Sequence, residues 1–293
     1  MILLDGKAVA SEIKQLLKKE INGYIKNGLR PPSLAVILVG DDPASNVYVK
    51  NKRESSEEVG INSLCLKLPS ETTEEELLKL IEKLNNDDDI DGILVQLPLP
   101  PHIHTQKVIE AISPTKDVDG FHPLNMGKLA TNVKDGVIPC TPLGIWLMLK
   151  HYKIPTFKKD VVIVGASNIV GKPMSLLFLK NEEATVTVCH RNTRDLKSHT
   201  LAAEILIVAV GKPKLITADM VQEGAVVIDV GINKLENGKL VGDTDFEKLK
   251  EKVSAITPVP GGVGPMTVAS LLVNTVHLYR LRHGFPAHPL TEI

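Results

Sequence analysis

Aromatic residues, cysteines and long apolar runs are all scarce in this 293-residue chain, and each shortage excludes a class of protein. Phe, Trp and Tyr together make up only 3% of the residues, which is too few for the stacking platforms that bind single-stranded nucleic acids. The net charge of −1 supplies no excess of basic groups for nucleic acid or an anionic membrane. The composition therefore argues against both kinds of partner.

The three cysteines, Cys65, Cys140 and Cys189, are odd in number and widely spaced, with no C-x-x-C pair. This pattern favours reduced, buried thiols in a cytoplasmic protein over a disulfide framework. The first apolar run is too short for a signal peptide, and no segment approaches the roughly twenty apolar residues of a membrane span. His102 and His104 have no carboxylate or thiol at ligand spacing, so we expect no metal site.

What the chain does contain is a strand, a glycine turn and a helix in succession. Val161–Val164 is a short β-branched run typical of a buried parallel strand. Gly165 ends the run, and Gly171 stands where a helix begins. This order points backbone N–H groups and a helix dipole at an anion, most commonly a nucleotide diphosphate. Ser167 occupies the position of the middle glycine of the G-x-G-x-x-G pattern.

Periodicity along the rest of the chain predicts an α/β protein. We expect helices over residues 6–27, 45–59, 70–84, 105–112, 143–152 and 267–281. We expect a first group of strands at 33–40, 61–68 and 90–97, and a second at 161–164, 185–189, 205–210, 225–230 and 255–259. Residues 124–142 read as a connection between the halves, and the tail from His283 as loosely held. The prediction is two α/β lobes around a cleft, the distal one a Rossmann-type dinucleotide-binding domain.

The end of the second distal strand indicates which dinucleotide binds. NAD sites place an acidic residue there for the ribose hydroxyls, whereas NADP sites place a cation. This strand ends Cys189-His190-Arg191-Asn192-Thr193, with no acid at its tip. Arg191 can meet a 2′-phosphate through two hydrogen bonds, although a solvated surface arginine is the commoner role for such a residue. We therefore predict NADP.

In the first lobe, Tyr48 and Lys52 lie four residues apart on a predicted helix, so they share one face. Gln96 stands at a strand end, and Asp119 lies in a polar loop. On spacing alone, a surface Tyr–Lys stack is the commoner outcome, and Gln96 and Asp119 are ordinary polar residues when each is considered individually.

Five motifs nevertheless occur in an order that resembles one enzyme family over about residues 2–282. These motifs are Tyr48-Val-Lys-Asn-Lys52, Val95-Gln-Leu-Pro-Leu-Pro100, Lys116-Asp-Val-Asp-Gly-Phe-His-Pro123, Gly165-Ala-Ser-Asn-Ile-Val-Gly171 and Pro258-Val-Pro-Gly-Gly-Val-Gly-Pro-Met-Thr267. The chain is similar to the bifunctional methylenetetrahydrofolate dehydrogenase/methenyltetrahydrofolate cyclohydrolases, the FolD family.

The resemblance implies oxidation of 5,10-methylenetetrahydrofolate with NADP, followed by hydrolysis of the methenyl product to 10-formyltetrahydrofolate. It implies that Lys52 serves the hydrolytic step, that Gln96 hydrogen-bonds this lysine, that Tyr48 packs on the folate rings and that Asp119 binds the pterin. It assigns cofactor contacts to Gly165, Ala166, Ser167 and Ile232. It further implies a folate-binding catalytic domain over 1–141, to which the helix at 267–282 returns, an NADP-binding domain over 142–266, and a homodimer.

One departure from the family pattern concerns the phosphate-binding cation. Many members carry Arg where this chain has Ala166, and Ser where it has Arg191, so here the arginine lies after the second distal strand. Three alternatives stay open. The chain could be another two-lobed NADP oxidoreductase, which would leave Tyr48, Lys52 and Gln96 without a role. It could be a nucleotide-binding sensor without turnover, or an enzyme that retains one of the two activities.

Overall fold

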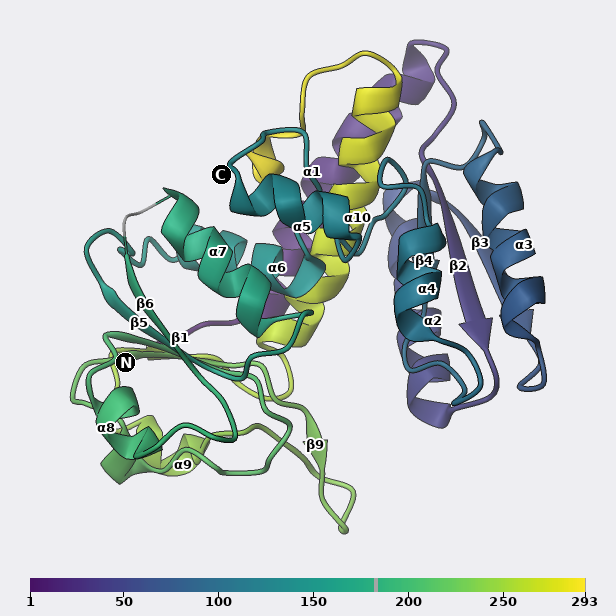
Figure 1. The fold of residues 1–293 in the computed structure, drawn as a ribbon. Helices are drawn as coiled ribbons and strands as arrows, with labels where there is room; N and C mark the ends of the chain where they lie inside the picture. Colours follow the sequence, from purple (N-terminus) through teal and green to yellow (C-terminus); the bar gives the residue numbers. More distant parts are fainter. Residues whose placement is uncertain (182–183, 293) are drawn as a thin grey trace. The chain divides into compact units, whose positions relative to one another are not determined.

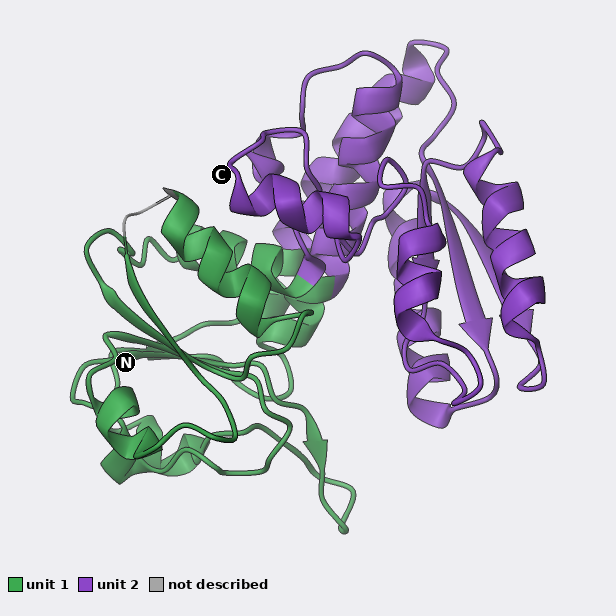
Figure 2. Cartoon of the chain, in the orientation of Figure 1, with its two compact units in different colours: residues 1–10, 141–267 green, residues 11–140, 268–293 purple. Residues whose placement is uncertain are grey.

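The computed structural model describes residues 1–181 and 184–292, and the chain divides into two compact units (Figure 2). Unit 1 comprises Met1–Ala10 and Thr141–Thr267, and unit 2 comprises Ser11–Cys140 and Val268–Ile293. Residues 1–10 therefore group with the distal lobe rather than with the first one. Among the described residues, no helix is long and apolar enough to cross a membrane.

Unit 1 is built on a parallel sheet of six strands in the order β1-β11-β8-β7-β5-β6. The strands are β1 (Ile2–Leu3), β5 (Asp160–Val164), β6 (Thr185–Cys189), β7 (Ile205–Val208), β8 (Val226–Asp229) and β11 (Ala255–Ile256). The chain runs outward from β5 to β6 and then returns to β7 on the other side of β5. The strand order thus reverses between β5 and β7, and doubly wound sheets bind ligands at the carboxyl ends of the strands at such a point.

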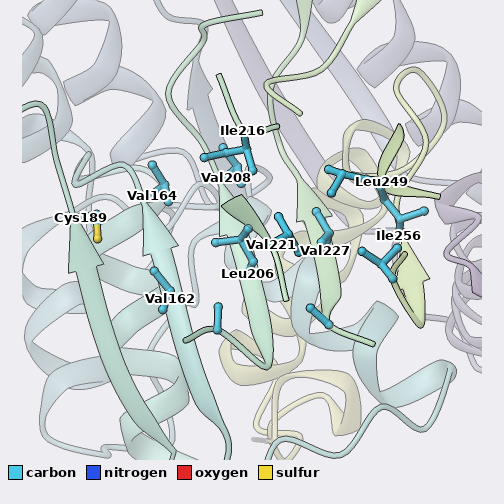
Figure 3. Close-up of a cluster of buried hydrophobic side chains, with 13 residues drawn as sticks. Val162, Val164, Cys189, Leu206, Val208, Ile216, Val221, Val227, Leu249 and Ile256 are labelled. Atoms are coloured by element: carbon cyan, nitrogen blue, oxygen red, sulfur yellow. The ribbon is translucent and has the colours of Figure 1, made fainter. Parts of the chain in front are cut away.

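Helices cover both faces of this sheet (Figure 1). The helices of unit 1 are α6 (Cys140–His151), α7 (Gly171–Asn181), α8 (Leu196–Leu201) and α9 (Phe246–Leu249). On one face α6 packs against α7, with the rings of Trp146 and Phe178 edge to face at 5.9 Å. On the other face, Val164, Val208 and Val227 gather with Leu249 in a buried apolar cluster (Figure 3). Burial on both sides explains the continuous β-branched runs of these strands.

Two further small elements interrupt the alternation in unit 1, the 3₁₀ turn η1 (Ala218–Met220) and an antiparallel hairpin of β9 (Asn233–Lys234) and β10 (Leu240–Val241). The predicted Rossmann-type architecture is confirmed. Two-residue β1 was not expected, because so short a strand carries no periodicity.

Unit 2 contains a parallel sheet of three strands in the order β3-β2-β4. The strands are β2 (Ser33–Val39), β3 (Asn62–Leu68) and β4 (Gly92–Val95); the helices are α1 (Gly6–Lys26), α2 (Pro43–Val59), α3 (Glu74–Asn85), α4 (Thr105–Ala111), α5 (Pro123–Ala130) and α10 (Val263–Arg282), followed by the 3₁₀ turn η2 (Pro289–Thr291). Apolar residues of α3 and α4 pack on β2 and β4 in one buried cluster. The predicted βαβαβ unit is confirmed.

Several boundaries differ from the prediction for local reasons. Helix α2 begins at Pro43, because the Asp42 carboxylate caps it by accepting the N–H of Ser45 at 2.7 Å; Ser45 is therefore not the cap. Helix α3 begins at Glu74, after a capping box formed by Thr73 and Glu76. The stretch expected to be an irregular connection contains α5, which starts where the His122 side chain accepts the N–H of Leu124.

The C-terminal tail is anchored rather than loosely held, so that expectation was wrong. His288 and Thr291 are buried. The N–H of His288 donates to His277 Nδ1 at 3.2 Å, and His288 Nε2 lies 3.0 Å from Glu20 Oε2. Residues that lack any sequence period are thus held by specific polar contacts to α1 and α10.

Candidate active site

The glycine turn after β5 approaches its neighbours too closely for any side chain. Gly165 has a φ of +124°, and a Cβ atom placed on it would lie 2.2 Å from the carbonyl oxygen of Ala209, just past β7. A Cβ atom on Gly171, the first residue of α7, would lie 1.9 Å from the carbonyl oxygen of Gly165. The backbone of the turn after β5 and the N-terminus of α7 therefore meet at the point where the strand order reverses. This geometry is typical of a site that binds a diphosphate.

Ser167 helps to shape this turn although it replaces a glycine. Its Oγ accepts the N–H of Val170 at 3.1 Å, and its carbonyl oxygen accepts the N–H of Lys172 at 3.0 Å. Ser167 is exposed, and Ala166 is half-buried. Both predicted cofactor residues thus lie on the turn itself.

The segment that carries Arg191 lies beside the same turn. Gly165 donates its N–H to the carbonyl oxygen of Cys189 at 2.9 Å, at the end of β6. His190 donates its N–H to Thr193 Oγ1 at 2.8 Å, which folds the segment into a tight turn. Arg191 is exposed at the head of this turn. The structure therefore brings the predicted phosphate-binding arginine to the carboxyl edge of the sheet, one strand away from the glycine turn.

Ile232 follows β8 at the same edge and is 44% exposed. Its Cδ1 atom lies 3.7 Å from where a Cβ atom of Gly264 would stand, at the start of α10. Of the cofactor residues predicted from the sequence, Ile232 alone presents an open apolar surface, which suits an aromatic ring.

In unit 2, the predicted catalytic pair is in direct contact. Lys52, on α2, donates from Nζ to Gln96 Oε1 at 3.0 Å. Gln96 directly follows β4, and its Nε2 donates to the carbonyl oxygen of Leu97 at 2.7 Å. This second bond fixes the amide so that its oxygen faces the lysine. Tyr48 lies one turn before Lys52 on α2 and is 41% exposed.

Asp119 belongs to the same unit and has an unusual electrostatic environment. Burial raises the pKa of its carboxyl to about 6, and the Lys52 ammonium acts against this increase. The Cys140 thiol lies 3.8 Å from Asp119 Oδ1 and donates to the carbonyl oxygen of Val118 at 3.3 Å. A carboxyl group whose pKa is close to neutral pH is present in both its protonated and its ionised form at physiological pH. It can therefore either donate or accept a hydrogen bond.

Three residues that support Asp119 were not predicted from the sequence. Asp117 accepts the N–H groups of Gly120 and His122 at 3.0 and 2.9 Å, which folds the loop around Asp119. Asn274, buried in α10, donates to the carbonyl oxygens of Val118 and Ile138 at 2.9 and 2.8 Å. The sequence feature that could have identified Asn274 is a polar amide side chain within an otherwise apolar helix.

The third of these residues, Cys140, was interpreted only as an inert buried thiol. Cys140 and Cys189 are buried, as expected, but Cys65 is exposed on the outer strand β3. The expectation of three buried thiols was therefore wrong for Cys65.

Comparison with known proteins assigns a family to these two sites. Residues 4–119 match the model for the tetrahydrofolate dehydrogenase/cyclohydrolase catalytic domain, and residues 139–283 match the NAD(P)-binding domain of the same enzymes. The chain belongs to the tetrahydrofolate dehydrogenase/cyclohydrolase family. It is a bifunctional dehydrogenase and cyclohydrolase of folate one-carbon metabolism, as the sequence motifs predicted.

Relatives in this family match over almost the whole chain. The bifunctional protein FolD of a Sulfurihydrogenibium species is 64% identical over 280 residues, which are 96% of this chain and 98% of its own. The Campylobacter jejuni FolD structure superposes with a TM-score of 0.94 at 54% identity, over 96% of this chain and 99% of its own. The Trypanosoma brucei enzyme, solved with NADP and an inhibitor, gives a TM-score of 0.90 at 34% identity, over 96% and 98%. Family membership favours the bifunctional enzyme over the alternatives of a sensor or another oxidoreductase.

Proposed function

We propose that unit 2 binds and hydrolyses the folate substrate, with Lys52, Gln96 and Asp119 as its catalytic groups and Tyr48 against the folate rings. The contact between Lys52 Nζ and Gln96 Oε1 at 3.0 Å is the observation on which this proposal depends. A lysine held by a fixed amide keeps a defined direction, so its Nζ can meet a water molecule or a substrate nitrogen reproducibly.

Hydrolysis of the methenyl group consumes one water molecule. Water adds to the methenyl carbon, and the bond from that carbon to N5 breaks, which leaves the formyl group on N10. One of the two water protons ends on N5, and the other leaves the site. In this proposal Lys52 relays the departing proton. Asp119, with a pKa of about 6, holds the pterin by hydrogen bonds.

We propose further that unit 1 binds NADP through Gly165, Ala166, Ser167, Arg191 and Ile232. The turn suits a dinucleotide because Gly165 and Gly171 let the backbone after β5 pack closely against Ala209 and the start of α7, which leaves the N-terminus of α7 at the carboxyl edge of the sheet, where a diphosphate is favoured. When bound, NADP supplies the acceptor for the hydride of the one-carbon bridge. The Arg191 guanidinium would bind the 2′-phosphate, and Ile232 would pack on an aromatic ring of the cofactor. The NADP-bound trypanosomal relative supports this choice of dinucleotide.

We also propose that the enzyme is a homodimer joined through unit 1. The cytoplasmic location inferred from the sequence stays a prediction.

Replacement of Lys52 by Met tests the hydrolytic assignment. The cyclohydrolase rate, followed by the loss of methenyl absorbance, is expected to fall at least about 100-fold, the usual scale for a positioned proton-transfer group. Dehydrogenase activity is expected to stay measurable. Lys50→Met is the matched control, because Lys50 is an exposed lysine on the same helix. Formation of formyl product at the parent rate by Lys52→Met would refute the role.

A further inference from the structure

Two buried carboxylates, Asp229 and Asp243, lie beneath the carboxyl edge of the sheet in unit 1, outside the residues assigned above. Asp243 follows β10, and Asp229 is the last residue of β8. The N–H of Asp243 donates to Asp229 Oδ1 at 2.9 Å. The backbone of Asp243 is thus bound to the Asp229 carboxylate, although the two residues lie fourteen positions apart in the chain.

Asp243 binds the loop that follows β7. Its Oδ2 accepts the N–H groups of Val210 and Gly211 at 2.7 and 2.9 Å, and its Oδ1 accepts the N–H of Lys212 at 2.8 Å. Three consecutive amides therefore converge on one carboxylate. Bonds of backbone amides to an ionised acceptor are among the stronger hydrogen bonds in proteins.

The same carboxylate also holds the loop that carries Ile232. Asp243 Oδ1 accepts a hydrogen bond from Asn233 Nδ2 at 2.9 Å. A Cβ atom on Gly231 would lie 2.2 Å from Asp243 Oδ1, so the loop packs directly on the carboxylate. Asp229 accepts the N–H of Gly231 at 3.0 Å from the other side. Both neighbours of Ile232 are therefore held by buried acids.

The loop after β7 forms a wall of the glycine turn. The carbonyl oxygen of Ala209 is the atom that a side chain at Gly165 would strike at 2.2 Å, and Val210 is the next residue, bound to Asp243. If the hydrogen bond between Val210 and Asp243 shifted, the adjacent Ala209 carbonyl group, which borders the glycine turn, would shift as well. Asp243 thus connects the phosphate-binding turn to the segment of Ile232, two parts of the cofactor site that are far apart in sequence.

We propose that Asp243 is a positioning residue for the cofactor, acting through the loops after β7 and β8 rather than by contact with the dinucleotide. This inference rests on the proposed assignment of the cofactor site to unit 1. Asp243→Asn retains the shape of the side chain but replaces one acceptor oxygen by an NH₂ group. That group would face N–H donors, so at least one amide would lose its partner.

The test measures both activities of the purified full-length variant. Asp243→Asn is expected to raise the KM for NADP about tenfold. The KM for methylenetetrahydrofolate and the cyclohydrolase rate on added methenyltetrahydrofolate are expected to stay within twofold of the parent. Cyclohydrolysis needs no hydride acceptor, so it serves as an internal control. Thr200→Val, which removes a buried hydroxyl from α8 in the same unit, is the control for a purely structural loss.

A folded Asp243→Asn enzyme with an unchanged KM for NADP would overturn the inference. So would an equal increase of this KM in Thr200→Val. If Asp243→Asn does not fold, Asn233→Ala decides the question, because it removes only one of the bonds to Asp243; the expected increase in KM is then two- to fivefold, and no increase overturns the inference. If the parent enzyme does not reduce NADP at all, it is the proposed function that fails.

Discussion

At the scale of single residues, Asp119 illustrates the free-energy cost of burying a carboxyl group. Burial raises its pKa from 3.8 to about 6. Between these two values, the folded protein retains the proton while the unfolded chain releases it. Stability therefore falls as the pH rises through this window, and the whole cost is present above pH 6. The cost is about 2 kcal/mol after allowance for partial exposure to solvent.

Asp119→Asn is accordingly expected to stabilise the protein by about 1–2 kcal/mol at pH 7.5, and most of this gain is expected to vanish at pH 4.5. Urea unfolding at the two pH values measures the difference, and the substrate KM is expected to rise in the same variant. Asp89→Asn, an exposed acid in the same unit, is the control and is expected to change stability by less than about 0.5 kcal/mol. A variant less stable than the parent at pH 7.5 would contradict the assigned electrostatics.

Arg191 is the residue that separates NADP from NAD in the proposed site. Loss of a charge-assisted pair with a phosphate costs about 1.5–3 kcal/mol, or roughly 10- to 100-fold in binding. Arg191→Ala is thus expected to raise the KM for NADP by this factor and to leave the KM for NAD within twofold. Arg194→Ala provides the control, since Arg194 is a second exposed arginine on the same segment. Equal losses for the two cofactors would remove Arg191 from the 2′-phosphate site.

At the scale of elements, the glycine turn at Gly165 packs tightly against the Ala209 carbonyl group and is also part of the proposed cofactor site. A substitution there is therefore expected to affect both stability and NADP binding. Gly165→Ala would place a methyl group 2.2 Å from the Ala209 carbonyl oxygen at a φ of +124°. We expect a loss of stability of at least about 2 kcal/mol together with weaker NADP binding. Gly23→Ala, on α1 with open space around it, is expected to stabilise by up to about 1 kcal/mol. Thermal unfolding and cofactor titration would separate the two cases; a neutral Gly165→Ala would disprove the tight contact.

Elements with a clear period could be predicted from the sequence, whereas elements defined by individual contacts could not. The buried strand β5 and its glycine turn were found because β-branched runs and glycines act locally. Helix α5 was missed because it is short and contains Gly127, so it has little apolar periodicity. The anchored tail was missed because His288 and Glu20 meet only in the folded chain.

The candidate site divides in the same way. The pairing of Lys52 with Gln96 was expected from the resemblance of their motifs to the FolD family, not from spacing or periodicity. The contacts of Asn274 and Asp243 join segments that lie far apart in the sequence, and no local pattern encodes how such segments meet. The contacts of Asp117 lie within its own loop, and no periodic pattern specifies how that loop folds.

At the scale of the whole molecule, the chain crosses between the two units three times: within α1, near residue 140 and within α10. Each unit is therefore assembled from two segments that are far apart in the sequence. The edge strand β1 shows the consequence, because it pairs with β11, which lies more than 250 residues later. Removal of the first ten residues would therefore alter the sheet of unit 1 rather than that of unit 2.

The proposed homodimer would require an exposed surface of unit 1 that can pair with a second chain. Strand β6 is one of the two outer strands of the six-stranded sheet, and an outer strand presents backbone groups that can pair with a second chain. Leu179, on helix α7, which packs against β6, is 57% exposed, so an interface that covers β6 would also bury this apolar side chain. The proposed interface on unit 1 can accordingly be tested at β6 and α7.

Sedimentation of the parent protein is expected to give twice the chain mass of 31.9 kDa. Introduction of charges by Leu179→Glu together with Val186→Lys, on β6, is expected to give single chains, because both charges would have to be buried without partners. Leu16→Glu provides the control, since Leu16 is 59% exposed but lies on α1 in unit 2. A parent that sediments as one chain refutes the dimer. Dissociation by Leu16→Glu alone would instead locate the interface on unit 2.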